Sequence, residues 1–338
     1  MKEERNINYD IIRIIACAMI IMMHSPISNE NANGFFLSSL SYLSAPGIGL
    51  FFMISGALLL PIHSDTKSFF KKRFTKILFP ALFWSLFYLC VKTIFIGKSI
   101  DIKAILSLLF SAQGNPVLWF VYTLVGLYLL APILSKWLQG SSIRELEFYL
   151  GLWTITLCYP LLKYIVVINS SDTGILYYFS GYAGYFILGF YLKSYPNRTS
   201  WQLLISLLII SMAVPVICKL EQVKVDFYDL FWYLSIFVVV QCVCWWKLIC
   251  GSSQINIGPK TSRFITELSK MTFGIYLVHI FIMRNILWHN NFILSINNYY
   301  LQTAVIIILT FILSAICTYL ISLLPKAQYI IGYKSSLK

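Results

Sequence analysis

Long apolar segments constrain the fold of this chain more than any other feature. A helix that crosses about 30 Å of hydrocarbon needs about 20 apolar residues, and such segments recur along the whole sequence. Hydrophobic residues make up 59% of the 338 residues and charged residues 12%, whereas soluble domains carry about 25% charged residues. This composition excludes a soluble globule and a disordered chain. It predicts an all-α, polytopic transmembrane bundle with spans at 10–28, 47–61, 76–97, 117–138, 146–168, 175–193, 201–219, 228–249, 272–290 and 299–324.

The second predicted span, 47–61, is shorter than the others. Pro46 and Pro61 bracket it and it contains Gly47, Gly49 and Gly56, so we expect a broken or partly re-entrant helix. Irregular backbone at membrane depth is tolerated only where protein buries it or where it lines a cavity. Because the connecting loops are mostly short, residues 1–338 are predicted to form a single integral membrane domain.

The distribution of basic residues indicates the orientation. The chain has 26 Lys and Arg residues against 13 Asp and Glu residues, a net charge of +13. Most of these cations share one side of the membrane if the N-terminus is cytoplasmic, and cytoplasmic loops are rich in Lys and Arg. Both termini are therefore predicted to be cytoplasmic, and the positive charge does not indicate nucleic-acid binding. The Cys and His residues have no spacing typical of a metal site, so no metal is expected.

The first predicted span carries three ionisable residues, Asp10, Arg13 and His24. Ionisable groups inside a membrane are costly and mark candidate functional sites. Arg13 and His24 are eleven positions apart, so they project within about 20° of one another and about 16 Å apart along the helix. Asp10 precedes Arg13 by about one turn and can pair with it. A snorkelling arginine and an interfacial histidine are the structural alternative, but the alignment favours a functional stripe that faces protein or water.

A cationic segment leads into the third predicted span and contains Lys72, Arg73 and Lys76. Arg73 and Lys76 are about one helical turn apart, and together they could hold the phosphates of a polyanionic cofactor. The same charges also suit a topology determinant that touches anionic lipid headgroups. Both interpretations place the segment at the cytoplasmic face.

Tyr276 and His279 are one helical turn apart within the ninth predicted span. Taken alone, this pair is better explained as a buried structural tyrosine and histidine than as a catalytic pair. Its interest lies in its place in a larger pattern of motifs.

Five short motifs follow one another along the chain. They are Asp10-Ile-Ile-Arg13 with ten residues to His24, Phe51-Phe52-Met53-Ile54-Ser55-Gly56, Lys72-Arg73-Phe74-x-Lys76-Ile77-x-x-Pro80, Leu118-Trp119-Phe120-Val121-Tyr122 with Tyr128 and Pro132, and Tyr276-Leu277-Val278-His279. Together they resemble the signatures of membrane acyltransferase family three, the bacterial O-acyltransferases that modify cell-surface glycans. Lys76 stands where that family more commonly has a second arginine.

The resemblance implies a multi-pass enzyme of the bacterial cytoplasmic membrane. It implies that an acyl group, usually acetyl, passes from cytoplasmic acyl-CoA to a hydroxyl of a glycan acceptor. His24 would act as general base or as transient acyl carrier. Arg13, held by Asp10, would orient the donor or stabilise charge on the thioester carbonyl.

The resemblance also implies two sets of binding residues. Coenzyme A phosphates would be held by Lys72, Arg73 and Lys76, with Ser55 beside the pantetheine arm. The substrate cavity would be lined by Trp119, Tyr122, Tyr276 and His279.

A membrane transporter of a small amino acid or of a lipid-linked sugar is the main alternative. Many transporters contain internal repeats with paired broken helices, whereas only one short span stands out here. Turnover of acetyl-CoA without solute uptake would distinguish the enzyme from the transporter.

Overall fold

The computed structural model describes residues 5–27, 34–97, 101–165, 174–251 and 257–335, and within these residues it contains helices and no strands. The α-helices are α1 (Ile7–His24), α2 (Gly34–Ser44), α3 (Pro46–Leu59), α4 (Thr66–Arg73), α5 (Phe79–Ile96), α6 (Ile102–Ser107), α7 (Trp119–Gly140), α8 (Ile143–Ile165), α9 (Ala183–Ser194), α10 (Trp201–Leu220), α11 (Phe227–Phe231), α12 (Ile236–Cys250), α13 (Pro259–Phe281), α14 (Asn291–Leu294), α15 (Tyr299–Ser322) and α16 (Gln328–Ile331). Two π-helices, η1 (Phe74–Leu78) and η4 (Ile282–Ile286), continue α4 and α13. Short 3-10 turns are η2 (Pro116–Leu118), η3 (Tyr177–Phe179) and η5 (Leu287–His289).

Eight helical segments of the described chain are long and apolar enough to cross a membrane. They are Ile7–His24, Ser39–Leu59, Thr66–Ile94, Pro116–Gly140, Trp201–Leu220, Phe227–Cys250, Pro259–His289 and Tyr299–Ser322. The polytopic helical fold predicted from composition is thereby confirmed. The other two predicted spans, 146–168 and 175–193, correspond to α8 and α9. These are helical, but α9 has only 12 residues and α8 includes four charged side chains.

The crossing segment that contains the second predicted span is broken, as predicted, but it begins before residue 47, where the predicted span began. The crossing segment is Ser39–Leu59, and it consists of the end of α2 and all of α3. The break lies at Ala45, because Pro46 occupies the first turn of α3, where its missing N–H leaves no hydrogen bond unmade. Helix α2 was not predicted as part of a span.

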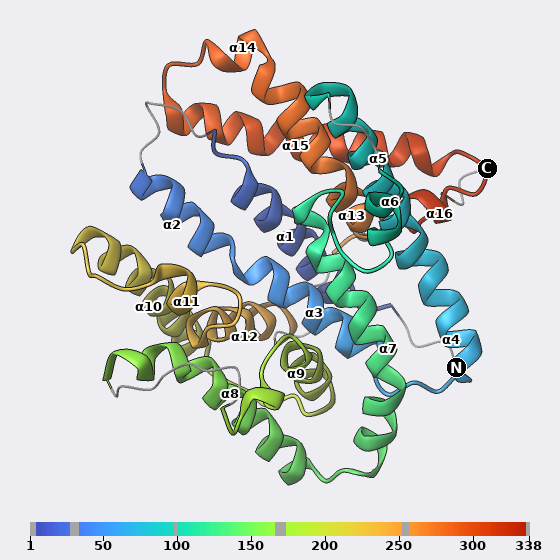
Figure 1. Ribbon diagram of the computed structural model, residues 1–338. Helices are drawn as coiled ribbons and strands as arrows, with labels where there is room; N and C mark the ends of the chain where they lie inside the picture. Colours follow the sequence, from blue (N-terminus) through green and yellow to red (C-terminus); the bar gives the residue numbers. More distant parts are fainter. Residues whose placement is uncertain (1–4, 28–33, 98–100, 166–173, 252–256, 336–338) are drawn as a thin grey trace. The chain divides into compact units, whose positions relative to one another are not determined.

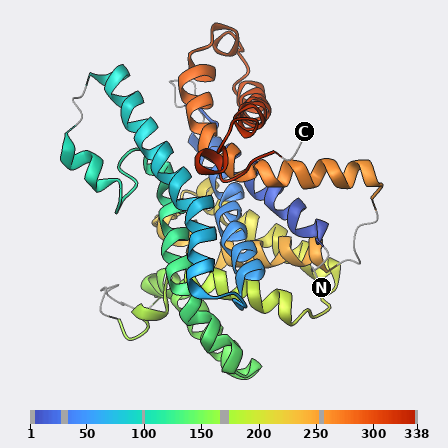
Figure 2. The same ribbon diagram turned by 90° about the vertical axis from the view of Figure 1, so that its right-hand side faces the viewer.

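By its contacts the chain divides into two compact units. Unit 1 comprises residues 1–60 and 136–269, and unit 2 comprises residues 61–135 and 270–338. Two of the unit boundaries fall inside helices, in α7 and in α13. The helical ribbon is drawn from two directions in Figures 1 and 2.

In unit 1, α3 packs against α9 at backbone distance. A Cβ added to Gly56 would meet the carbonyl oxygen of Phe186, and a Cβ added to Gly189 would meet that of Met53. The two glycines therefore allow the helices to approach more closely than side chains would permit. The glycine of the Phe-Phe-x-x-Ser-Gly motif thus has a packing role.

In unit 2, hydrogen bonds between distant segments hold the helices together. The Trp84 Nε1–H donates to the carbonyl oxygen of Ile330 (2.9 Å), and the Tyr88 hydroxyl donates to that of Leu277 (2.8 Å). The run from α4 through η1 to α5 is continuous and is seen from the side in Figure 2, coloured light blue to teal. Helix α14 lies at the turn between α13 and α15 (Figure 1).

Candidate functional site

The carboxylate of Asp10 is the centre of a buried polar cluster in unit 1. Arg5 donates to it through both Nε and Nη2, each at 2.7 Å, in a bidentate arrangement. The Ser269 hydroxyl donates to Oδ1 at 2.7 Å, and the Thr266 hydroxyl lies 3.4 Å from Oδ2. Because the Asp10 side chain is only 3% exposed, this set of donors compensates a carboxylate that burial would otherwise destabilise.

Arg5, rather than Arg13, is the principal partner of Asp10. The Asp10–Arg13 pair predicted from helical spacing is present, but its closest atoms are 3.9 Å apart. The hydrogen bonds to Asp10, opposed by burial, raise the pKa of Arg5, and the charges of Asp10 and Glu267 add to the rise. Arg5 therefore stays protonated and completes the neutralisation of this carboxylate.

The stripe between Arg13 and His24 on α1 is packed against protein. Cys17 and Ile20 lie on this stripe and are 1% and 2% exposed. Arg13 and His24 are themselves half-buried, and His24 is the last residue of α1. Ser25 then closes the helix, with its hydroxyl donating to the carbonyl oxygen of Ile21 (2.5 Å). The helix thus presents a cation near one end and an imidazole at the other end of the same protein-facing side.

Ser55 belongs to unit 1 as well and lies in the middle of α3. Its hydroxyl donates to the carbonyl oxygen of Phe51 (2.9 Å) and its side chain is half-buried. The next residue, Gly56, is committed to the contact with α9. A pantetheine contact at Ser55 stays a prediction.

The cationic segment in unit 2 is helical rather than a loop, since α4 begins at Thr66. Arg73 ends α4 and stacks on the Phe69 ring at 5.8 Å, and its buried Nε has no hydrogen-bond partner among the described residues. Lys72 and Lys76 are exposed, and Lys76 experiences the positive charges of both Lys72 and Arg73. Three cations thus repel one another at a point where no described carboxylate forms an ion pair with them.

The π-helix η1 changes the spacing within this cationic segment. Lys76 lies inside η1, so the turn between Arg73 and Lys76 is wider than the α-helical turn assumed from the sequence. The backbone carbonyl of Lys76 contacts Gly332, which has φ +70° and ends α16. A glycine is needed there both for this conformation and for the close approach.

The predicted cavity residues of unit 2 take part in hydrogen bonds with the backbone. The Tyr122 hydroxyl pairs with that of Ser85 (3.0 Å) and donates to the carbonyl oxygen of Leu108 (2.6 Å). The Tyr276 hydroxyl donates to the carbonyl oxygen of Val117. These bonds join α7 to α5 and to the end of α6, and they join α13 to the turn η2.

His279 and Trp119 complete that predicted set. His279 is fully buried, and its Nδ1–H donates to the carbonyl oxygen of Tyr276. The rings of Tyr276 and His279 lie 5.6 Å apart. Trp119 is half-buried and begins α7, directly after the turn η2.

The predicted residues therefore form two groups, one in each unit. Asp10, Arg13, His24 and Ser55 belong to unit 1, and the other group in unit 2 comprises Lys72, Arg73, Lys76, Trp119, Tyr122, Tyr276 and His279. Sequence reasoning missed Arg5, Ser269 and Thr266. Arg5 lies before the helix, five positions before Asp10, and the hydroxyls of Ser269 and Thr266 belong to α13, far away in the sequence. Helical periodicity could therefore not reveal them.

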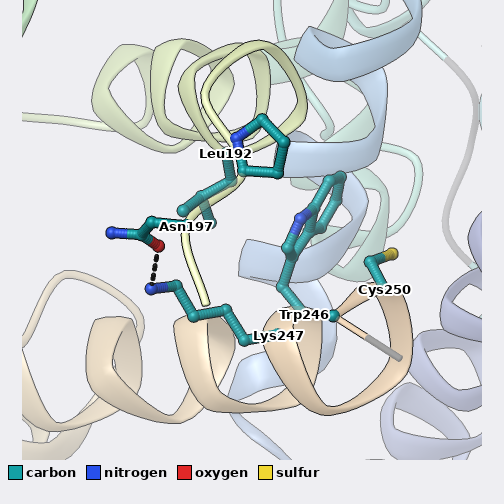
Figure 3. A pocket seen from close by; sticks show the side chains of 7 residues that line it. Leu192, Asn197, Trp246, Lys247 and Cys250 are labelled. Atoms are coloured by element: carbon teal, nitrogen blue, oxygen red, sulfur yellow. Dashed lines mark hydrogen bonds between the residues drawn. The ribbon is translucent and has the colours of Figure 1, made fainter. Parts of the chain in front are cut away.

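A small pocket in unit 1 lies where α9 and α12 end (Figure 3). The Lys247 Nζ donates to the Asn197 side-chain oxygen (2.5 Å) and to the Thr199 hydroxyl (2.9 Å), and Trp246 and Cys250 form other walls. Its volume of about 40 Å³ is small beside the 300–1,000 Å³ typical of ligand sites, by about an order of magnitude. None of these residues was predicted, and the pocket is too small for a cofactor.

Comparison with known proteins identifies one family. The model of a family described as an acyltransferase domain matches residues 6–322, nearly the whole chain. No curated protein and no solved structure matches.

Proposed function

The chain belongs to this acyltransferase 3 family and is a multi-pass membrane acyltransferase, and on that premise we propose its donor, its acceptor and its catalytic residues. The donor is acyl-CoA, with acetyl as the expected group, and the acceptor is a hydroxyl of a cell-surface glycan. The enzyme resides in the bacterial cytoplasmic membrane with both termini in the cytoplasm. The observation that carries the proposal is the protein-facing stripe of α1, which joins a guanidinium to an imidazole.

His24 acts as the general base in this proposal. It removes the proton of the acceptor hydroxyl as the hydroxyl oxygen attacks the thioester carbonyl. The tetrahedral intermediate then collapses, the carbon–sulfur bond breaks, and the coenzyme A thiolate takes the proton back from His24. Arg13 lies about 16 Å from His24 along the helix, so it orients the donor at a point away from the reacting carbonyl. The Asp10 cluster supports this role because it fixes the first turn of α1, directly before the turn that carries Arg13.

The cationic segment binds the phosphates of the donor. Arg73 supplies a planar guanidinium with a buried Nε that no described residue uses. Lys72 and Lys76 add exposed ammonium groups. Phosphate oxygens would relieve the mutual repulsion of the three cations and accept charge-assisted hydrogen bonds from them.

Acyl transfer by a His24→Ala variant tests the base. Loss of a general base lowers kcat by about 10²–10⁴-fold, while the affinity for acetyl-CoA and the yield of folded protein stay unchanged. The matched control is His63→Ala, since His63 is exposed in the loop before α4. Wild-type turnover by His24→Ala would overturn the assignment.

Two further measurements separate the alternatives. Incubation with labelled acetyl-CoA in the absence of acceptor leaves no label on the protein if His24 is a base, and leaves label on His24 if it is an acyl carrier. Uptake of a labelled amino acid or sugar by proteoliposomes, without turnover of acetyl-CoA, would contradict the enzymatic function and support a transporter.

A further inference from the structure

Arg284 lies in a π-helix at the end of the crossing segment Pro259–His289. Single π-turns are rare in proteins, and those that occur are often found at functional sites. The guanidinium stacks on the Trp288 ring, with its Cζ 5.4 Å from the ring centre. Arg284 is exposed, so this stacked guanidinium is accessible from outside the helix bundle.

No described carboxylate pairs with Arg284. The last acidic residue of the chain is Glu267, and residues 268–338 contain neither Asp nor Glu. Within unit 2 the acidic residues are Asp65 and Asp101, and the side chain of each accepts hydrogen bonds from backbone amides at the start of its own helix. Among the residues that the structure describes, Arg284 is therefore a cation without a paired carboxylate.

Trp288 provides a second donor beside Arg284. Its indole Nε1 is buried and has no hydrogen-bond partner in the part of the chain that the structure describes. A buried donor without an acceptor costs free energy, which a ligand oxygen would recover. The pair therefore offers donors from a guanidinium and an indole, a combination that suits an oxyanion.

The surrounding segment suits the neutral part of a sugar. His289, Asn291 and Asn297 are exposed, and side-chain amides and imidazoles exchange hydrogen bonds with hydroxyl groups. The segment is also held in place, because Gln302 Nε2 donates to the carbonyl oxygen of Ile293 (2.9 Å) and Asn290 caps α14. A binding surface on a fixed segment loses little entropy when a ligand binds.

From these observations we propose that Arg284 and Trp288 bind the acceptor, and that the acceptor is a glycan with an anionic group, a carboxylate or a phosphate. This proposal rests on the proposed function, which places the N-terminus in the cytoplasm. If the N-terminus is cytoplasmic, α13 runs from the cytoplasm outward, and Arg284 lies at the outer face, where a surface glycan is found. The cationic segment around Arg73 binds the donor at the opposite face.

Binding of oligosaccharides without any donor tests this site. The protein is placed in nanodiscs of zwitterionic lipid, and saturation-transfer NMR compares a hyaluronan hexasaccharide, which alternates uronate and N-acetylglucosamine, with neutral chitohexaose. A glycerol phosphate oligomer gives the phosphate arm. We expect one of the anionic probes to bind about tenfold more tightly than chitohexaose, the difference that a charge-assisted hydrogen bond provides.

Variants then assign the preference to the two residues. Arg284→Gln should lower the affinity for the anionic probe to that for the neutral probe. Trp288→Phe keeps the aromatic ring but removes the N–H, and it should lower the affinity for the anionic probe several-fold. Arg263→Gln is the matched control, since Arg263 is exposed near the other end of α13. Equal binding of anionic and neutral probes, or an unchanged preference in Arg284→Gln, would overturn the proposal.

Anionic lipid is the competing ligand for an arginine and a tryptophan near the membrane surface. If phosphatidylglycerol in the nanodisc abolishes glycan binding and Arg284→Gln instead lowers the affinity for that lipid, the site binds headgroups and the proposal is wrong. Because no donor is present, the result is independent of catalysis. Glycan binding that depends on Arg284 in a protein without acetyl-CoA turnover would refute the proposed reaction and leave the binding site intact.

Discussion

The cluster around Asp10 and the cationic segment around Arg73 treat charge in opposite ways. Asp10 is buried and is surrounded by donors from Arg5, Ser269 and Thr266. Arg73 and its neighbouring lysines have no described carboxylate among their partners. A buried charge with hydrogen-bond partners fixes the position of the helices that supply those partners. A group of like charges without carboxylate partners repels itself, so an anionic ligand would stabilise it more than the protein does. The first region therefore fixes the start of α1, and the second region is the donor-binding site under the proposed function.

The largest expected effect comes from removing the charge of the compensated region. Asp10→Asn removes the principal countercharge of Arg5 and places an amide where the carboxylate accepted hydrogen bonds from Arg5 and Ser269. We expect the free energy of unfolding to fall by about 3 kcal/mol, the cost of breaking a buried ion pair, and acyl transfer to fall with it. Thermal unfolding in detergent measures the first effect. Asp226→Asn, at the exposed start of α11, should change little, and an unaltered melting temperature in Asp10→Asn would show that the cluster does not hold α1.

Charge reversal in the uncompensated region should affect binding and leave stability nearly unchanged. Arg73→Glu adds repulsion toward the donor phosphates, so we expect the dissociation constant for acetyl-CoA to rise about a hundredfold, with the wild-type affinity falling as salt increases. Equilibrium binding of labelled acetyl-CoA measures this change. Lys67→Glu, an exposed position on the first turn of the same helix, serves as the control. Equal affinity in Arg73→Glu and wild type would remove the donor site from this segment.

The smallest expected effect concerns the cap of the helix that carries Arg73. Hydrogen bonds from Ser68 and Lys67 hold the pKa of Asp65 below its ordinary value of 3.8. Because the folded pKa is lowered, the cap stabilises α4 above pH 3.8 and this stabilisation is lost as the pH falls through the folded value. Hydrogen exchange of the α4 amides, corrected for intrinsic rates, should therefore accelerate at acidic pH in the wild type. The Asp65→Ala variant should not show this acceleration of hydrogen exchange at acidic pH, whereas Asp101→Ala at α6 should still show it.

The sequence predicted the features that depend on local composition. The apolar runs predicted the spans, and Pro46 predicted the break before α3. The alignment of Arg13 with His24 followed from helical geometry alone. Contacts between distant segments were beyond this reasoning. The glycine contact between α3 and α9 depends on two helices that the sequence does not pair, and Ser269 meets Asp10 across most of the chain.

Features of backbone geometry were also missed. Helix α2 has 11 residues and follows a polar stretch, so its hydrophobicity did not extend over the length of a span. The π-helices η1 and η4 carry no sequence signature, yet they contain Lys76 and Arg284. Both departures from regular helix coincide with proposed binding groups, which is where local rules and function are expected to conflict.

The wide turn at η1 makes the spacing of the cations in the proposed phosphate-binding segment an adjustable property. A π-turn holds about one residue more than an α-turn, so deleting Ile77 would restore regular winding, keep the azimuth of α4 relative to α5, and return Arg73 and Lys76 to α-helical spacing. No cationic side chain would change its chemistry. A single codon deletion would thus alter the distance between the cations while preserving their number, a control that substitutions cannot provide.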